Sequence, residues 1–250
     1  MLNHKTALIT GGSRGIGAVV AENLGRNGYY VYLNCRKTNN NIQQVLNTIL
    51  SEGGNGEIIE FDVANKNSIE QAIGNAKVER IDLLLNNAGI LFDNLICNLE
   101  LEQWESIINT NFWGSYNVME CVFGKLMNSP SPVVINMGST SGVKPRKGQG
   151  AYSVSKAMII EWTAHLTTQE QYKKIHAFCI SPGPVETEMI MSSPWYADPK
   201  SKKRIPLGRY AKPQEISNLI HFLAEEPKVF KNGFNFIIDG GFTQTVKDLE

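Results

Sequence analysis

The segment TGGSRGIG, residues 10–17, decides the fold, because it lies between an apolar run of strand length and a stretch with helical spacing. Its glycines Gly11, Gly15 and Gly17 would let the backbone approach a pyrophosphate at a helix N-terminus, whose amides and dipole favour negative charge. No Lys-Ser or Lys-Thr pair follows, which argues against a nucleoside triphosphate loop. The segment therefore predicts a dinucleotide site; the alternative is a tight turn whose glycines serve packing.

Apolar runs of strand length recur along the chain, separated by longer segments that are compatible with helices. They cover residues 6–10, 29–33, 58–61, 81–85, 133–137, 175–180 and 234–238. The first helix is expected over 15–27, with Gly28 where a left-handed cap would fit. This alternation predicts an α/β fold, a doubly wound parallel sheet of seven strands with helices on both faces. No repeat or domain boundary is visible, so we expect one domain spanning 1–250.

Composition and charge argue against several kinds of partner. Lysine and arginine together number 24, as do aspartate and glutamate, so no overall field attracts nucleic acid or an anionic membrane. The first residues, MLNHKTALITGG, show no leader pattern, and no apolar run approaches the ~20 residues of a membrane span, so we expect a cytoplasmic protein. The four cysteines and four histidines show no paired or HExxH spacing, so we expect neither disulfides nor a metal site.

Small and polar residues follow three further strands of the predicted sheet. The segments are NNAG at 86–89, GSTSG at 138–142 and SPGP at 181–184. In an open parallel sheet the ligand crevice lies outside the carboxyl ends of the strands, so these segments should converge on one site. Each of them alone could equally be an ordinary turn.

Residues 182–209 break the alternation of strands and helices. The segment holds five prolines and several aromatic residues. We predict a mobile lid over the substrate pocket.

Tyr152 and Lys156 stand four positions apart in the helix-compatible stretch AYSVSKA, so one helical turn stacks their side chains. A free phenol, with a pKa of ~10, is a poor proton donor at neutral pH. An ammonium at ~4 Å is worth ~4 kcal/mol at an effective dielectric of about 20, or about three pKa units in favour of tyrosinate. Beside a dinucleotide, such a tyrosine would exchange a proton with a substrate oxygen. The alternative is a structural pair, because this spacing is common in helices.

Seven segments together resemble the short-chain dehydrogenase/reductase family, from the first strand to the C-terminus. In chain order they are TGGSRGIG, NNAG, INTNFWG, NMGSTSG, YSVSK, SPGPVET and IIDGG. The resemblance implies a Rossmann-type fold and a catalytic tetrad of Asn111, Ser139, Tyr152 and Lys156. Tyr152 would be the general acid in carbonyl reduction, and Ser139 would hold the substrate oxygen. Lys156 would bind the nicotinamide ribose and tune Tyr152, and Asn111 would fix a water that returns protons. Each residue alone could be structural.

The resemblance also implies which residues contact the cofactor. They lie in the glycine turn, after four of the strands and in the tyrosine helix: Gly11, Ser13, Arg14, Gly15, Ile16, Gly17, Asp62, Val63, Asn87, Ala88, Gly89, Tyr152, Lys156, Pro182, Gly183, Val185 and Thr187. The pair at 62–63 would flank the adenine, and Val185 and Thr187 would contact the carboxamide. Several of these could equally serve sheet or loop packing.

Charge at the end of the second strand favours NADP over NAD. There YLNCRK places Cys35 where family members that use NAD carry an acid for the ribose 2′-hydroxyl, and Arg36 follows. With Arg14 and Arg36 available and no carboxylate, a 2′-phosphate would be attracted. We predict NADP; the alternative is that Arg36 and Lys37 are solvated turn residues.

Three segments resemble one branch of the family, the β-ketoacyl-acyl carrier protein reductases: NNAGILFDNLICNLELEQW, GQGAYSVSKA and IPLGRYAKPQEI. Phe92 departs from that branch, which usually has arginine there. The resemblance implies NADPH-dependent reduction of a 3-oxoacyl thioester on an acyl carrier protein, in fatty-acid or polyketide-type assembly. Two other functions stay open: conversion of a free ketone, sugar or polyol, and a dinucleotide-binding protein without turnover.

Partners follow from the same resemblance. Carrier proteins are acidic, so docking would use basic side chains, and those available are Lys173, Lys174, Lys200, Lys202, Lys203 and Arg204. An apolar lining for the acyl chain would come from Met189, Met191, Trp195 and Tyr196. Family members usually form homotetramers through the helices expected at 102–128 and 151–170. Their apolar residues Trp113, Val118, Val122, Phe123 and Trp162 would form that interface or an ordinary core face.

Overall fold

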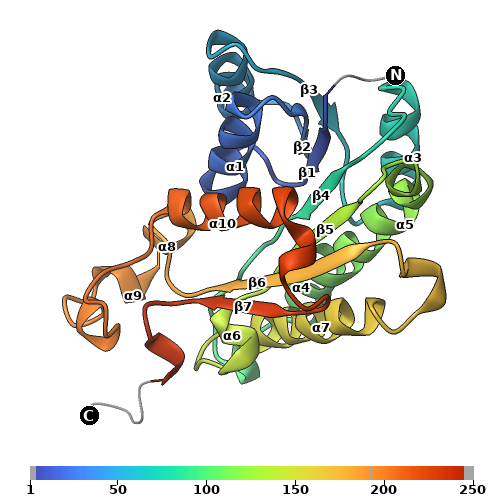
Figure 1. The fold of residues 1–250 in the computed structure, drawn as a ribbon. Coiled ribbons are helices and arrows are strands. Elements are labelled where there is room, and N and C mark those ends of the chain that lie inside the picture. Colours follow the sequence, from blue (N-terminus) through green and yellow to red (C-terminus); the bar gives the residue numbers. More distant parts are fainter. Residues whose placement is uncertain (1–3, 192, 245–250) are drawn as a thin grey trace.

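The computed structural model of the protein describes residues 4–191 and 193–244, and its strands form one parallel sheet (Figure 1). The seven strands lie in the order β3-β2-β1-β4-β5-β6-β7. Their bounds are β1 Thr6–Ile9, β2 Tyr30–Cys35, β3 Asn55–Glu60, β4 Leu83–Asn86, β5 Val133–Met137, β6 His176–Pro182 and β7 Asn235–Ile238. From β1 the sheet extends through β2 to β3 on one side. From β4, which lies next to β1, it extends through β5 and β6 to β7 on the other side. The switch between β1 and β4 opens a crevice at their carboxyl ends.

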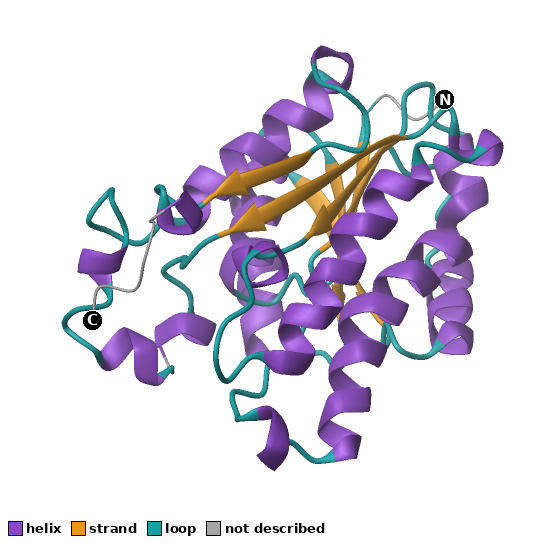
Figure 2. Cartoon of the chain, turned by 90° about the horizontal axis from the view of Figure 1, so that it is seen from below, coloured by secondary structure: helices purple, strands orange, loops and turns teal. Residues whose placement is uncertain are grey.

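Helices cover both faces of the sheet, as Figure 2 shows. On one face lie α1 Gly15–Arg26, α2 Asn40–Ser51 and α10 Pro213–Glu225, and on the other lie α3 Lys66–Asn75, α4 Leu101–Ile108, α5 Gly114–Met127 and α7 Gly150–Leu166. Successive residues of a strand point to opposite faces of the sheet, and each face has its own hydrophobic core. Ile9 packs in the core that contains Leu24 of α1, and Leu8 packs in the core that contains Val118 of α5. The predicted doubly wound sheet of one domain is confirmed.

Shorter helices connect the main elements. They are α6 Thr140–Val143, α8 Glu188–Met191, α9 Pro194–Ala197, η1 Ile96–Asn98, η2 Asn109–Trp113, η3 Glu170–Tyr172, η4 Lys202–Arg204, η5 Pro227–Val229 and η6 Phe242–Gln244. The segment η2 is a π-helix and the other η segments are 3-10 turns.

The bounds of the observed strands lie close to those predicted from the sequence. The predicted run 133–137 is β5 itself, and the other runs differ from the observed strands by one to three residues at an end. The largest difference is in β3, which begins at Asn55 instead of residue 58. This edge strand opens with the polar segment NGE, which pairs with β2 through backbone hydrogen bonds that need no apolar side chains.

The helix expected over 102–128 is interrupted. Its two α-helical parts, α4 and α5, are separated by the π-helical turn Asn109–Trp113, and the second long helix ends at Leu166 instead of residue 170. Two of the side chains predicted for a subunit interface, Val118 and Val122, are completely buried in the core of this chain. They are therefore core residues, whereas Trp113 is 45% exposed on the same pair of helices.

The segment predicted as a lid, 182–209, folds at the carboxyl edge of the sheet, where Figure 1 shows α8 and α9. It is anchored at one end by the backbone hydrogen bond from Glu186 N to Ala211 O, 2.9 Å. The ring of Trp195 in α9 packs 5.5 Å from that of the buried Tyr210. Within the described ranges, no helix combines the length and apolarity needed to cross a bilayer.

Candidate active site

The glycine turn between β1 and α1 adopts the close backbone approach that the sequence predicts. Gly11 and Gly15 have positive φ angles of +64° and +57°. A Cβ on Gly17 would lie 2.4 Å from the Gly11 carbonyl oxygen and 2.6 Å from Asn87 Nδ2, so only glycine fits there. The N-cap residue Arg14 makes no side-chain hydrogen bond to the helix start, and the first turn has no acidic residue. The geometry therefore fits an anionic group such as a pyrophosphate at the start of α1.

Hydrogen bonds fasten the loop after β4 to this turn. Thr10 Oγ1 accepts from the backbone amides of Asn87 and Ala88 at 2.9 and 3.0 Å. In return, Asn87 Nδ2 donates to the carbonyl oxygens of Thr10 and Gly11 at 3.0 and 3.1 Å. The side chain of Asn87 thus fixes the shape of the glycine turn, in addition to any contact with a ligand.

One cavity of about 180 Å³ opens at the carboxyl ends of the strands. Three of the four predicted catalytic residues line it, namely Ser139, Tyr152 and Lys156. Seven further residues predicted for cofactor binding line it as well: Ile16, Asn87, Gly89, Pro182, Gly183, Val185 and Thr187. The predicted convergence of the strand-end segments is therefore observed.

The remaining predicted residues lie along the same sheet edge but outside this cavity. They are Gly11, Ser13, Arg14, Gly15, Gly17 and Ala88 at the glycine turn, Arg36 after β2, and Asp62 and Val63 after β3. Val63 is buried and packs against Gly114. The guanidinium of Arg14 forms an exposed ion pair with Glu188 of α8, 3.2 Å, which links the glycine turn to the lid segment. Arg36 is exposed.

Lys156 is buried, with 5% of its surface exposed. Its Nζ donates to the Met137 carbonyl oxygen at the end of β5, 2.7 Å. Burial lowers the pKa of this ammonium to about 8. The loop after β4 lies beside this ammonium, because a Cβ on Gly89 would be in ordinary contact with Nζ at 3.7 Å. Lys156 is thus a desolvated cation with one backbone acceptor.

Tyr152 does not have the lowered pKa that we expected from its neighbour. Burial raises the pKa of the phenol, as does the charge of Asp93, whereas a hydrogen bond with Ser139 and the charge of Arg146 lower it. The lysine Nζ lies 5.7 Å from the centre of the tyrosine ring and turns toward Met137. The expected direction was therefore wrong: loss of solvent, the largest effect, outweighs the hydrogen bond with Ser139 and the charge of Arg146, so the pKa of the phenol lies above its ordinary value.

Ser139 stands at the N-cap of α6. Its backbone is extended, with φ −167° and ψ 153°, and its Oγ accepts from Ser141 N at 3.1 Å. That cap holds the hydroxyl at the cavity wall beside Tyr152.

Asn111 lies completely buried in the π-helical turn, and outside the cavity. Its Oδ1 accepts from Ile90 N at 2.8 Å, and its Nδ2 donates to Ile90 O at 3.1 Å and to Ser155 Oγ at 3.0 Å. The amide therefore ties the loop after β4 to the tyrosine helix. Its expected role in holding a water stays a prediction.

Sequence reasoning missed three polar residues of the cavity wall, Asp93, Arg146 and Gln149. Gln149 Nε2 donates to Asp93 Oδ1 at 3.1 Å, and Ser141 Oγ donates to Gln149 Oε1 at 2.8 Å. The segment KPRKGQ, which contains Arg146 and Gln149, has the composition of a solvated basic turn. The only signal that these two residues belong to the site was their closeness to Tyr152 in the sequence.

The lid lines the cavity with Met189, Ile190, Ser193 and Trp195, a set that differs from the expected one. Met189 and Trp195 line the cavity, but Met191, 49% exposed, and Tyr196, which stacks on Tyr210, do not. The short helices α8 and α9 turn these two side chains away from the cavity.

The fold and this wall of serine, tyrosine and lysine define a Rossmann-type oxidoreductase, and comparison with known proteins specifies the family. Residues 5–195 match the family model for short chain dehydrogenases, so the chain belongs to that family. It is 32% identical to the 3-oxoacyl-[acyl-carrier-protein] reductase of Synechocystis over 96% of this chain and 97% of the relative. It is 34% identical to 3-oxoacyl-[acyl-carrier-protein] reductase FabG of Chlamydia trachomatis, over 96% and 98%.

A solved structure gives the same fold. The putative gluconate dehydrogenase from Agrobacterium tumefaciens superposes with a TM-score of 0.88 at 29% identity, covering 97% of each chain.

Gly17→Ala should disrupt the dinucleotide cradle, because the added methyl group would collide with backbone oxygen and with Asn87. We expect binding of NADPH, measured by fluorescence titration, to weaken at least roughly tenfold. Gly74→Ala and Gly124→Ala are matched controls, since each lies in a helix with nothing within 4 Å of a new Cβ. These controls should bind as the wild type does; equal weakening in all three variants would contradict the cradle.

The buried ammonium of Lys156 should make stability depend on pH. Its pKa is about 8 in the folded protein and 10.5 ordinarily, so between these values the unfolded chain binds more protons. The free energy of unfolding should therefore rise with pH relative to Lys156→Met, by about 2–4 kcal/mol over the full range. Urea unfolding of both proteins from pH 7 to 9.5 measures the difference. Parallel curves would show that the ammonium is not desolvated.

Proposed function

We propose that this protein uses NADPH to reduce the ketone of a 3-oxoacyl thioester carried on an acyl carrier protein. The observation that carries the proposal is the common cavity of Ser139, Tyr152 and Lys156 beside the glycine turn. Support comes also from relatives named 3-oxoacyl-[acyl-carrier-protein] reductase, which match nearly the whole chain.

The chemistry divides between the cofactor and the chain. A bound nicotinamide supplies hydride to the carbonyl carbon. The Ser139 hydroxyl would donate to the carbonyl oxygen and stabilise the charge that develops there. Tyr152 would give its proton to that oxygen, so the C=O bond becomes a C–H and an O–H bond. A phenol whose pKa is raised keeps the proton until the oxygen becomes strongly basic.

The cofactor would lie along the carboxyl edge of the sheet. Its pyrophosphate would bind at the glycine turn, its nicotinamide ribose at Tyr152 and Lys156, and its carboxamide at Val185 and Thr187. Asp62 and Val63 would flank the adenine.

A 2′-phosphate fits the charge distribution after β2. Cys35 at the end of this strand is a buried thiol, and Arg36 follows it exposed to solvent. The nearest carboxylate by strand pairing is Glu60, opposite Cys35, and its Oε2 accepts from Thr38 N at 2.8 Å. Because this acid is engaged with the backbone, Arg36 is available for phosphate.

Docking of an acidic carrier protein would use the basic part of the lid segment. Lys200, Lys202, Lys203 and Arg204 are exposed there, on the segment that carries the cavity residues Met189 and Trp195. Lys173 and Lys174 lie before the start of β6, at the opposite edge of the sheet from the cavity. We therefore assign docking to the lid group, which we call the lid cations.

A free polar ketone, sugar or polyol is the second candidate substrate. Asp93, Gln149 and Arg146 make part of the cavity wall polar, which suits a small hydroxylated molecule. A structural neighbour carries the name putative gluconate dehydrogenase.

We also propose a homotetramer in the cytoplasm. Phe112, Trp113, Tyr116 and Trp162 form an aromatic group on η2, α5 and α7, and Trp113 is 45% exposed. Such an apolar surface is suited to subunit contact.

The deciding experiment compares NADPH oxidation with acetoacetyl-acyl carrier protein, acetoacetyl-pantetheine and simple ketones. We expect the carrier-bound substrate to have the highest kcat/KM, and Tyr152→Phe to abolish turnover while it binds NADPH normally. The double substitution Lys200→Glu with Lys203→Glu should lower kcat/KM roughly tenfold for the carrier-bound substrate alone. The two new negative charges among the lid cations would repel the acidic carrier protein. Lys173→Glu with Lys174→Glu is the control. Preference for simple ketones would favour the second candidate.

Cofactor choice rests on Arg36 and Arg14. Arg36→Ala should weaken NADPH binding roughly 10- to 100-fold and leave NADH binding unchanged, because only the former carries the 2′-phosphate. Glu188→Gln frees Arg14 from its ion pair and should strengthen NADPH binding slightly. Equal binding of the two cofactors to the wild type would remove the argument for NADP.

A further inference from the structure

Arg146 is a half-buried cation in the wall of the reaction cavity. It lies in the loop between α6 and α7, six residues before Tyr152. Burial lowers the pKa of its guanidinium, and the charge of Arg204 does so as well, while that of Asp93 opposes the effect. A guanidinium that has lost part of its solvent gains most from an oxygen acceptor that replaces the water.

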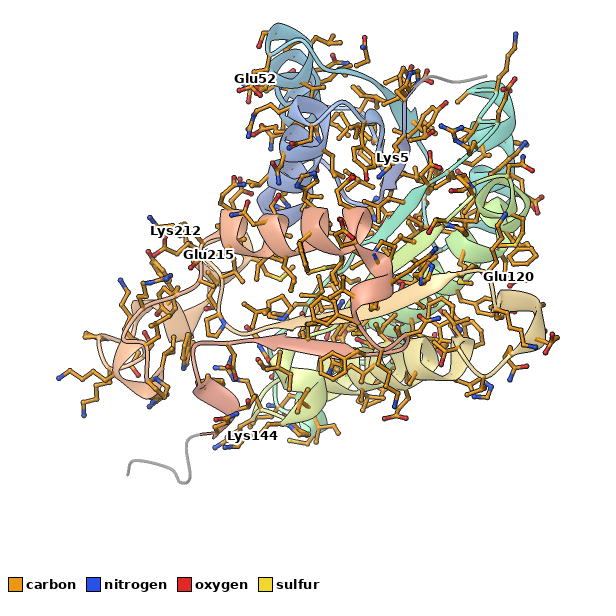
Figure 3. The ribbon with its side chains drawn as sticks, viewed as in Figure 1. Lys5, Glu52, Glu120, Lys144, Lys212 and Glu215 are labelled. Carbon is orange, nitrogen blue, oxygen red and sulfur yellow. The ribbon has the colours of Figure 1, made fainter. Side chains whose placement is uncertain are left out.

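Aromatic rings fix the position of this guanidinium. Its central carbon lies 4.8 Å from the ring centre of Trp195 in α9 and 5.3 Å from that of Phe242 in η6. Figure 3 labels Lys144, two residues earlier, beside the C-terminal turn that carries Phe242. Stacking on the ring faces leaves the edge of the guanidinium plane, where its five N–H groups point, for hydrogen bonds.

Those N–H groups have no acceptor in the part of the chain that the structure describes. The side chain of Arg146 forms neither a salt bridge nor a hydrogen bond with any residue of 4–191 or 193–244. Asp93, whose charge acts on Arg146, accepts instead from Gln149 Nε2 at 3.1 Å. By contrast Arg209, an exposed cation of the same region, is paired with Glu215 at 2.7 Å.

The cavity brings this cation near the reacting hydroxyls. Arg146, Ser139 and Tyr152 line the same space of about 180 Å³, and the charge of Arg146 acts on the phenol. A molecule that reaches both Tyr152 and Arg146 within this cavity should carry two oxygen functions, one for the phenol and one for the guanidinium. A 3-oxoacyl group has this pattern, with its ketone at carbon 3 and an oxygen on carbon 1.

We propose that Arg146 determines specificity by donating hydrogen bonds to the carbon-1 oxygen of the substrate while Tyr152 and Ser139 hold the ketone at carbon 3. The inference rests on the proposed function and names the substrate class, a 1,3-dicarbonyl compound. The oxygen belongs either to a thioester carbonyl or to a free carboxylate, and a carboxylate would accept two bonds from the planar guanidinium.

Arg146→Met tests the proposal against substrates with and without the second oxygen. For acetoacetyl-pantetheine and for acetoacetate, kcat/KM should fall roughly 10- to 100-fold, the size expected for losing a hydrogen bond to a charged group. For 2-pentanone, which lacks the carbon-1 oxygen, it should change less than about threefold. Arg146→Lys should restore part of the activity toward both dicarbonyl substrates. A larger loss for acetoacetate than for the thioester would identify the carboxylate as the natural acceptor, and the reverse would identify the thioester.

Two control variants separate recognition from packing. Lys147→Met removes an adjacent exposed cation outside the cavity wall and should leave all three substrates unchanged. Trp195→Leu removes one stacking ring and reports on the lid contact. An equal loss for all three substrates in Arg146→Met, reproduced by Trp195→Leu, would show that Arg146 only holds the lid segment and would overturn the proposal. No loss for any substrate would overturn it as well.

Binding without turnover keeps this test separate from the proposed function. Titration of the NADP complex of Tyr152→Phe, followed by tryptophan fluorescence, should give at least roughly tenfold weaker binding of acetoacetate after the added change Arg146→Met. Binding of 2-pentanone should not change. If the wild type reduces neither dicarbonyl substrate but this difference persists, the proposed reaction fails and the role of Arg146 stands. If the wild type reduces the dicarbonyl substrates normally but Arg146→Met does not weaken acetoacetate binding, the proposed reaction stands and the role of Arg146 fails.

Discussion

The hydrogen bond from Lys156 Nζ to the Met137 carbonyl oxygen, 2.7 Å, is the constraint on which the site depends. Removing an ammonium from water costs several kcal/mol, and one backbone acceptor offsets only part of this. The surrounding packing must supply the rest. A Cβ on Gly142 would lie 2.7 Å from the Lys156 backbone, and one on Gly138 would lie 2.5 Å from Ser181 Oγ. Glycines at these positions let α6 and β6 close around the lysine.

Two sets of interactions hold the opposite sides of the crevice. Thr10 and Asn87 join the ends of β1 and β4 at the glycine turn, while Asn111 joins the loop after β4 to the tyrosine helix. The same loop therefore contacts both the expected cofactor side and the hydroxyls of the cavity. The fixed backbone of this loop aligns the expected cofactor side of the crevice with the hydroxyls of the cavity. Such alignment of reacting groups is a large part of catalysis by proximity.

Patterns that act locally were readable from the sequence. The glycines of 10–17 and the small residues after β4, β5 and β6 reflect close backbone approaches, so they predicted the sheet edge and most of the cavity wall. Features set by distant packing were not readable. The pKa of Tyr152 depends on desolvation by the surrounding wall, and the guanidinium of Arg146 is covered by Trp195 and Phe242, which lie far along the chain. The π-helical turn at Asn109–Trp113 likewise has no periodic signal.

Burial shifts the pKa values of the two central groups in opposite directions. It raises the pKa of the Tyr152 phenol and lowers that of the Lys156 ammonium to about 8, so both changes disfavour the charged form of the group. A reaction that creates an alkoxide reverses this balance, because the new negative charge stabilises Lys156 and Arg146 as cations and draws the proton from Tyr152. In the proposed reduction, the wall would thus interact more strongly with the developing charge than with a neutral ketone, which is the condition for lowering the barrier.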